Sequence, residues 1–207
     1  MGAIQNLCKI SILLERGQIL LLGPTDVITD KYLLSNSDTN LNGFRKINES
    51  NLQDKHFIFQ SIAVSSPNKE PSSEIPLSSG LEIKIEYKIT EKIKGMNIAI
   101  HLVNSNGITV LSSTDVDENY NDISRTRFPG TYIAKCFINS HYLRPGRYSI
   151  GISSSIPNFL ILGNLPDAIS FDVIDTGSIE SKISQGRQGV ISPILHWQTF
   201  SEAQNGS

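Results

Sequence analysis

Residues 128–155, FPGTYIAKCFINSHYLRPGRYSIGISSS, contain the strongest strand signal of this 207-residue chain. A Pro-Gly pair begins each half, at 129–130 and at 145–146, and such pairs mark turns. Within each half every second residue is apolar or aromatic, namely Tyr132, Ala134, Cys136 and Ile138, then Tyr148, Ile150 and Ile152. A period of two is typical of a strand with one buried face. The stretch therefore predicts two strands joined as a hairpin.

Segments on both sides of this stretch carry the same signal. Residues 81–90, LEIKIEYKIT, alternate strictly between apolar and charged, which predicts one face on a core and the other in water. Further candidate strands, separated by turn residues, are 56–64, 96–103, 108–113, 168–174 and 190–197. Short strands with frequent turns are typical of an antiparallel sandwich. We therefore expect a mainly β fold, with a β-sandwich over residues 54–207.

The beginning of the chain has a different pattern. Residues 1–34 predict a short α/β fragment, with strands at 10–14 and 18–22 and a helix opened by Gly23-Pro24. So small a fragment cannot bury a core of its own, and we expect it to belong to a larger unit. Residues 35–53 are rich in Asn and Ser, which predicts a linker.

Composition narrows the class of protein. The chain has 18 basic and 20 acidic residues, a balance that does not favour nucleic acid or an anionic membrane surface as a partner. It contains no apolar run of about 18 residues, so no transmembrane helix is expected. The two cysteines, Cys8 and Cys136, are predicted to be buried thiols, which agrees with a reducing compartment.

Catalytic motifs are missing from the sequence. It has neither G-x-x-x-x-G-K-[ST] nor G-x-G-x-x-G, the two glycine-rich patterns that cradle phosphates. The four histidines lack the spacing of a zinc site, and no nucleophile elbow occurs. We therefore expect a non-enzymatic chain with no catalytic residues and no cofactor of its own.

An acidic stretch that begins at Asp115 is a weak calcium candidate. Asp115, Asp117 and Asn119 supply oxygen atoms at alternate positions, as a hard cation requires. However, Tyr120 stands where an EF-hand needs Gly, and Thr126 where it needs Glu. A solvated acidic turn is the favoured interpretation, and a loose calcium site is the alternative.

The reverse faces of two predicted strands are more apolar than a solvated surface requires. In the strand that contains Tyr132 and Ile138, alternation places Ile133, Lys135 and Phe137 on the face that points away from the core. In the strand at 96–103 it places His101 and Val103 on the corresponding outer face. Aromatic rings stack on the C–H faces of sugars, while polar side chains bind hydroxyl groups. These five residues are the candidate carbohydrate-binding face. The alternative is that the face packs on the linker or on a second subunit.

The end of the chain predicts a strand that can change partners. Residues 175–189 are polar and contain three glycines, at 177, 186 and 189, and the apolar segment 190–197, VISPILHW, follows. A terminal strand after a flexible segment can pair with its own sheet or with that of a second copy.

Two groups of residues resemble known families. The first fragment resembles the end of the ATPase domain of an ABC transporter, through Leu7-Cys8, Ile12, Leu14, Gly17, Ile19, Gly23, Val27-Ile28 and Tyr32. The remainder resembles the C-terminal domain of Wzt-type ATPases, which export O-antigen and related polysaccharides. The residues that carry this second resemblance are Pro129–Tyr132, Ile138, Leu143, Pro145-Gly146, Tyr148, Gly186, Gly189-Val190, Pro193 and Trp197.

The resemblance implies a cytoplasmic, immunoglobulin-like sandwich, held at the inner face of the plasma membrane by the transporter complex. It also implies a homodimer formed by exchange of the last strand, and contact with the membrane permease through the ATPase domain of a longer parent. The Walker A, signature, Walker B and switch-histidine segments are absent, so ATP and magnesium would belong to that parent.

The leading hypothesis is a non-catalytic domain that binds the nascent O-antigen-type polysaccharide and recruits it for ATP-driven export. The alternative is a structural dimerisation module of the ATPase subunit without a glycan site. A calcium-dependent sugar binder is a third possibility.

Overall fold

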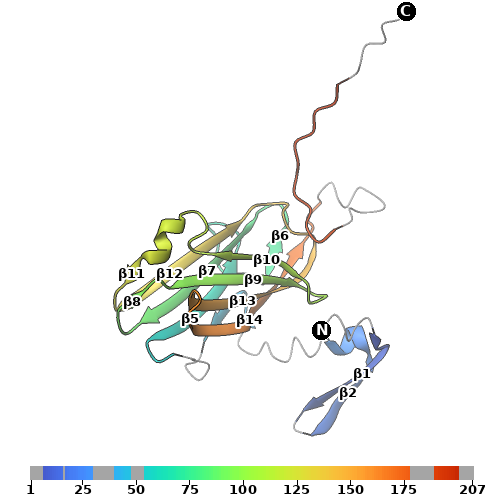
Figure 1. Ribbon diagram of the computed structural model, residues 1–207. Helices are drawn as coiled ribbons and strands as arrows, with labels where there is room; N and C mark the ends of the chain where they lie inside the picture. The colour runs from blue at the N-terminus through green and yellow to red at the C-terminus, as the bar shows by residue number, and fades with distance from the viewer. Residues whose placement is uncertain (1–6, 16, 30–39, 48–53, 178–188, 201–207) are drawn as a thin grey trace, which may run out of the picture.

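Two five-stranded sheets make up most of the computed structural model, which describes residues 7–15, 17–29, 40–47, 54–177 and 189–200 (Figure 1). The first, here the β7 sheet, has the spatial order β12 (Gly130–Ile138), β7 (Leu81–Ile89), β5 (Phe57–Ser65), β4 (Phe44–Lys46) and β3 (Asn40–Leu41). The second, the β9 sheet, has the order β10 (Thr109–Thr114), β9 (Asn97–Asn104), β13 (Gly146–Ile156), β14 (Leu160–Ile174) and β6 (Glu74–Pro76). Neighbouring strands in these sheets are antiparallel, apart from the parallel pair β14–β6.

The core lies between the two sheets and follows from alternation. In β7 the apolar residues Ile83, Ile85 and Tyr87 are buried, while Lys84 and Lys88 are exposed. A side chain of this kind contributes roughly 1.5–3 kcal/mol when it is fully buried. The predicted mainly β fold, with an antiparallel β-sandwich, is confirmed.

The two strands of residues 128–155 do not form a hairpin. β12 pairs with β7 in continuous register, whereas β13 pairs with β9 and β14 in the other sheet. The segment between them crosses from one sheet to the other. At its end, the Tyr148 hydroxyl donates to the carbonyl of Arg144 at 2.9 Å, the hydrogen bond of a tyrosine corner in immunoglobulin-like sandwiches. The hairpin prediction was wrong because alternation is local and does not specify which strands pair.

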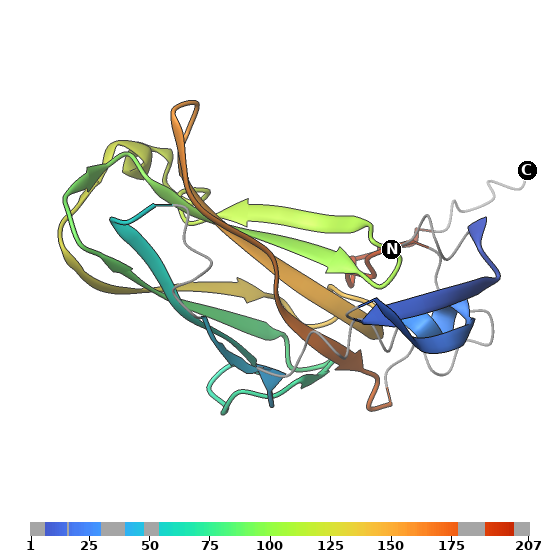
Figure 2. The ribbon, with the colours of Figure 1, turned by 90° about the horizontal axis from the view of Figure 1, so that it is seen from below.

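One long side of the sandwich is closed by β14. A bulge in β14 at residues 166–168, opposite Gly151 of β13, lets β14 bend, and Figure 2 shows the β13–β14 hairpin running obliquely across the strands of the β7 sheet. Arg45 donates from Nη1 to the carbonyls of Asp167 and Ala168, at 2.6 and 2.8 Å. Gly163 lies against the rings of Phe57 and Phe59, so close that a Cβ there would be 3.1 Å from the Phe59 ring.

On the opposite side, β12 and β10 are the outermost strands of their sheets. Near one end of this side, β8 (Ile93–Lys94) pairs with β11 (Thr126–Arg127), next to the 3-10 helix η2 (Tyr120–Ser124). The inward side chains of β12, namely Tyr132, Ala134 and Cys136, are only half-buried, although the equivalent residues of β7 are fully buried. The sheets are therefore parted along the β12 edge.

The N-terminal fragment contains the two predicted strands, β1 (Ile10–Glu15) and β2 (Gln18–Pro24), as an antiparallel hairpin. A short helix follows over residues 25–29, so Pro24 ends β2 and does not open the helix as predicted. Cys8 is exposed and Cys136 is half-buried, which corrects the prediction of two buried thiols. No helix of the described residues is long and apolar enough to cross a membrane.

Part of the predicted linker belongs to the sandwich. Residues 40–46 form the β3–β4 hairpin, which extends the β7 sheet by pairing Phe44 with Ala63. Asn42 and Gly43 turn this hairpin with positive φ angles of 52° and 77°, a conformation that Asn-Gly pairs favour. Ile47, also in the predicted linker, is buried in the core, and its N–H donates to the Gln60 carbonyl at 2.8 Å. Residues 35–39 and 48–53 are outside the described ranges.

The predicted last strand is not a strand in this structure. Ile191 forms a single bridge with Leu143, and the Ser192 N–H donates to the Tyr142 carbonyl at 2.9 Å. Residues 193–200 continue without regular secondary structure. Most of the preceding polar segment, residues 178–188, lies outside the described part of the chain.

Candidate functional site

The structure divides the predicted carbohydrate-binding face into two surfaces. Ile133, Lys135 and Phe137 lie together on the outer face of β12, as alternation predicted. His101 and Val103 lie on the outer face of β9, which belongs to the opposite sheet. The prediction of one continuous face was wrong, because the sheet to which each strand belongs depends on pairing between distant segments.

The outer face of β12 combines exposed apolar groups with one ion pair to the neighbouring strand β7. Ile133 and Phe137 are 55% and 59% exposed. The Lys135 ammonium binds Oε1 of Glu82 at 2.8 Å, and the Glu82 side chain is only 11% exposed. This β12 outer patch therefore offers an aromatic ring next to a fixed ion pair.

The histidine on the other surface is held by its neighbours. Nδ1 of His101 is 2.9 Å from the Ser112 hydroxyl, and Nε2 is 3.2 Å from the Ser153 hydroxyl. Both ring nitrogens are therefore used inside the sheet, and His101 is poorly placed to reach a ligand.

A cleft between the inner faces of the sheets opens beside β12. It has a volume of about 620 Å³. Its apolar wall consists of Ile85, Tyr87, Ile98, Ile100, Tyr132, Ala134 and Cys136. Sequence analysis assigned the inward residues of β12 to the core, because only the pairing of β12 makes it an edge strand. In the sequence of β12, only the small side chains of Ala134 and Cys136 indicate that space is left beside this strand.

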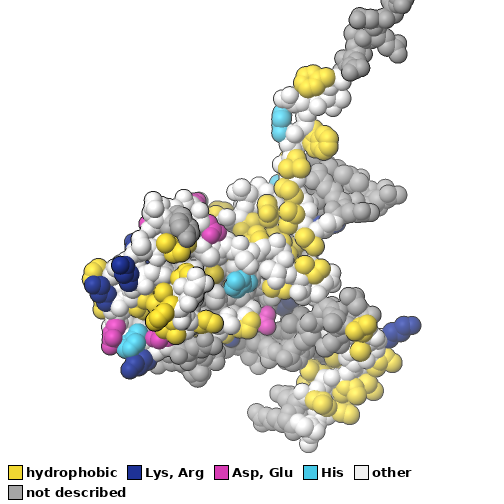
Figure 3. Space-filling model, viewed as in Figure 1, with side chains coloured by type: hydrophobic (Ala, Val, Ile, Leu, Met, Phe, Trp, Pro, Cys, Tyr) yellow, Lys and Arg dark blue, Asp and Glu magenta, His cyan; other side chains and the backbone are white. Residues whose placement is uncertain are grey.

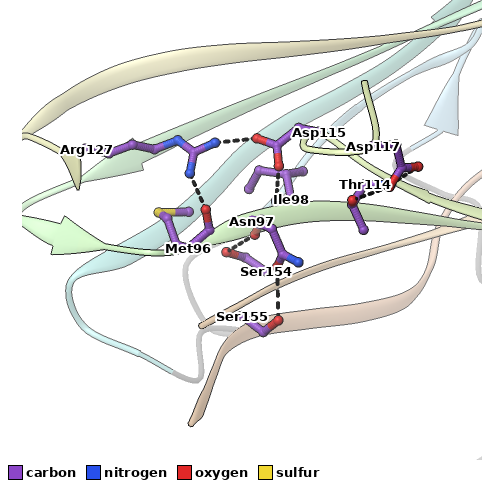
Figure 4. Close-up of polar contacts among 9 residues, drawn as sticks. All are labelled: Met96, Asn97, Ile98, Thr114, Asp115, Asp117, Arg127, Ser154 and Ser155. Carbon is purple, nitrogen blue, oxygen red and sulfur yellow. Dashed lines mark hydrogen bonds and ion pairs between the residues drawn. The ribbon is translucent and has the colours of Figure 1, made fainter. Parts of the chain in front are cut away.

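A buried ion pair forms one end of the cleft (Figure 4). The guanidinium of Arg127 donates to the Asp115 carboxylate and to the carbonyl of Met96. Asp115 also accepts the Ile98 N–H at 2.9 Å. The Arg127 side chain is only 7% exposed, and such a charge is tolerated when its donors are satisfied.

Two stacked tyrosines stand next to this ion pair. The rings of Tyr87 and Tyr132 are 5.4 Å apart and nearly parallel. Burial raises the pKa of Tyr87, an effect that Arg127 partly offsets. The Tyr132 hydroxyl accepts the N–H of Phe128 and donates to its carbonyl, at 3.1 and 2.7 Å. These contacts fix the wall of the cleft before any ligand arrives.

Asp117 is an exposed carboxylate that lines the same cleft. It accepts hydrogen bonds from the Ser113 hydroxyl, the Thr114 N–H and the Thr114 hydroxyl, at 2.7, 2.9 and 2.6 Å. These bonds lower the pKa of Asp117. Burial raises the pKa of the Cys136 thiol, and the charge of Asp117 raises it further.

The three calcium candidates have separate partners inside the protein. Asp115 binds Arg127, Asp117 binds Ser113 and Thr114, and Asn119 accepts the N–H of Asn121 at 3.3 Å. Among the residues that the structure describes, no three His, Cys, Asp or Glu side chains are grouped as a metal site requires. The geometry therefore favours the acidic turn over the calcium site.

Comparisons with known proteins give one family match and several structures of similar fold. The Wzt C-terminal domain family model matches residues 50–190. A crystal structure of the C-terminal domain of Wzt superposes with a TM-score of 0.57 at 11% identity, covering 72% of this chain and 86% of that one. A Niemann–Pick type C2 protein from the Japanese carpenter ant covers 58% of this chain and 95% of its own at 11% identity, with a TM-score of 0.41, too low to support an argument. The comparison with curated proteins gives no significant match.

Proposed function

The chain belongs to the Wzt C-terminal domain family, and we therefore propose that it recruits a glycan for a polysaccharide-export ABC transporter. The family match, over residues 50–190, is the observation that carries this proposal, since it supports a role in a Wzt-type transporter. In this role the domain is not catalytic. It binds the nascent O-antigen-type polysaccharide in the cytoplasm, and the ATPase domain of a longer parent, with ATP and magnesium, drives export.

The β12 outer patch supports the glycan part of the proposal. Phe137 offers an exposed ring on which a sugar can stack, and the Lys135–Glu82 pair offers a donor and an acceptor for hydroxyl groups. Binding to such an open surface would be weak for each sugar unit, and a repeating polymer would compensate through many equivalent units.

A calorimetric titration with the surface polysaccharide of the source organism tests this proposal. Phe137→Ser should weaken binding at least tenfold. Phe159→Ser is the matched control, because Phe159 is 82% exposed at the tip of the β13–β14 hairpin, away from the patch. Equal affinities for the two variants would show that the glycan does not use the patch.

Two exposed apolar surfaces support the proposed partners (Figure 3). On the N-terminal fragment Ile10, Leu14 and Leu22 are exposed, as expected if this hairpin packs within an ATPase domain that contacts the permease. Along the tail Ile194 and Trp197 are 67% and 83% exposed, as expected if the tail pairs with a second copy. The proposed assembly is a homodimer at the inner face of the plasma membrane.

The exposed tail also favours the second candidate, a dimerisation module without a glycan site. Deletion of residues 189–197 should convert a dimer into a monomer in light scattering if the tail is exchanged. A deletion variant that remains dimeric would exclude exchange. An intact dimer that binds no polysaccharide at millimolar concentration would favour the structural role over glycan recruitment.

A further inference from the structure

We propose that the cleft between β12 and β10 binds one uncharged sugar unit of the exported glycan. This inference rests on the proposed function and assigns it a pocket that continues from the β12 outer patch, since Ile133, Lys135 and Phe137 also line the cleft. The volume of about 620 Å³ falls in the range of roughly 300–1,000 Å³ that is typical of small-ligand sites. The cleft is therefore large enough for a sugar residue and part of its neighbour.

The walls of the cleft match the two kinds of surface on a sugar ring. Ile98, Ile100 and the half-exposed Ala134 form an apolar wall for the C–H face. At the other side, the Ser113 hydroxyl donates to Asp117 and can still accept a hydrogen bond from a sugar hydroxyl. The exposed Asp117 carboxylate accepts three hydrogen bonds and has about one acceptor site left for a second hydroxyl. A site that is mostly apolar, with a few fixed polar groups, is typical of ligand pockets.

The charge of the cleft favours an uncharged unit. The lining contains three carboxylates, Asp115, Asp117 and Glu118, and three cations, Arg125, Arg127 and Lys135. Arg127 is already paired with Asp115, and Lys135 with Glu82. Asp117 remains ionised at neutral pH, because its hydrogen bonds lower its pKa. An acidic sugar would therefore meet two carboxylates, Asp117 and Glu118, with Arg125 as the remaining cation.

The cleft is also preorganised. The Tyr87–Tyr132 stack and the hydrogen bonds between Tyr132 and Phe128 fix the position of the Tyr132 ring in the wall of the cleft. A pocket that exists before binding loses less conformational entropy when it is filled.

The two cysteines of the chain provide the test. Cys136 lines the cleft, and Cys8 is exposed on the N-terminal fragment. Alkylation of the full chain with N-ethylmaleimide is followed by mass spectrometry at both thiols. The added probes are methyl glycosides of glucose, galactose, mannose and N-acetylglucosamine, each at increasing concentration. When a glycoside that binds the cleft is present at ten times its Kd, alkylation of Cys136 should be about tenfold slower. Cys8 should react at an unchanged rate.

The charge argument is tested with the methyl glycosides of glucuronic and galacturonic acid. These probes should protect Cys136 at least tenfold less well than their uncharged counterparts. Equal protection by the acidic probes would overturn the assignment of an uncharged unit.

A variant that fills the cleft, compared with a control variant elsewhere, tests the position of the site. Ala134→Leu places a larger side chain in the cleft and should abolish both protection of Cys136 and binding of the polysaccharide. Phe159→Ser changes an exposed residue at the tip of the β13–β14 hairpin, which does not line the cleft, and should leave protection unchanged. Thermal unfolding of both variants shows whether they remain folded.

The outcomes separate this inference from the proposed function. Binding of the polysaccharide without protection of Cys136 would overturn the pocket and leave glycan recruitment standing. Protection by glycosides without binding of the polysaccharide would support the pocket and count against recruitment. Protection that rises with protein concentration in the absence of sugar would show that a second copy covers the cleft, and would also overturn the pocket.

Discussion

The two long sides of the sandwich differ in how the sheets meet. On one side β14 bends across the edge, and its backbone lies against Phe57, Phe59 and the Arg45 guanidinium. On the other side β12 and β10 end their sheets, and the space between them is a cleft of about 620 Å³. A closed side contributes packing, whereas an open side exposes inward-facing residues to a ligand. The two sides of one domain therefore differ in packing: one is filled by β14, and the other keeps an open cleft.

The largest expected loss of stability comes from a cavity created on the closed side. Phe57 is fully buried, and Phe57→Ala should lower the free energy of unfolding by about 3–5 kcal/mol. On the open side Tyr132→Ala should cost about 1–2 kcal/mol, since that ring is half-exposed and loses mainly its stack on Tyr87. Urea unfolding of both variants measures the contrast, and equal losses would show that the two sides are packed alike.

The buried ion pair of the cleft should give the next largest effect. Arg127→Met leaves the Asp115 carboxylate without its cation, and should destabilise the fold by about 2–3 kcal/mol. The value is below that of a fully buried pair, because the Asp115 side chain is 22% exposed. Arg125→Met is the control, because Arg125 is exposed and its loss should change stability by no more than about 0.5 kcal/mol. Similar results for the two variants would mean that the ion pair is not structural.

Enlarging a small residue should destabilise the closed side and leave the stability of the open side nearly unchanged. Gly163→Leu forces a side chain against the Phe57 and Phe59 rings, and should cost about 1–3 kcal/mol. Ala134→Leu extends into the cleft and should change the free energy of unfolding by less than about 0.5 kcal/mol. Chemical denaturation gives both values, and a large loss at Ala134 would indicate that the cleft is filled in the native state.

The smallest expected effect is a pH dependence of the folding stability that comes from Asp117 in the cleft. The pKa of Asp117 is lower in the folded chain than its ordinary value of 3.8, so the ionised carboxylate favours folding above that pH. This contribution is lost as the pH falls through the folded pKa. Asp117→Asn should therefore be less stable than the parent at pH 7, and the difference should narrow below about pH 4. A difference that stays constant down to pH 2 would show that the carboxylate charge is not involved.

Much of the strand content could be predicted from the sequence. The alternation of β7, β9, β12 and β13 is written in consecutive residues, and the outward positions of Ile133, Lys135 and Phe137 follow directly from it. The β3–β4 hairpin was missed although its Asn42-Gly43 turn is a recognised signal, because the surrounding polar residues favoured a linker. Within the described ranges the predicted terminal strand pairs only through the Leu143–Ile191 bridge, and its exchange with a second copy stays a prediction.

The sequence by itself determined most strands of the sandwich and which side chains of each strand share a face. Successive side chains of a strand point to opposite faces, so this information is local. Only the tertiary structure decided that β12 and β13 belong to different sheets, that His101 is separated from Phe137, and that β12 ends its sheet beside a cleft. Pairing depends on contacts between residues that are far apart in the chain, and no period in the sequence records them.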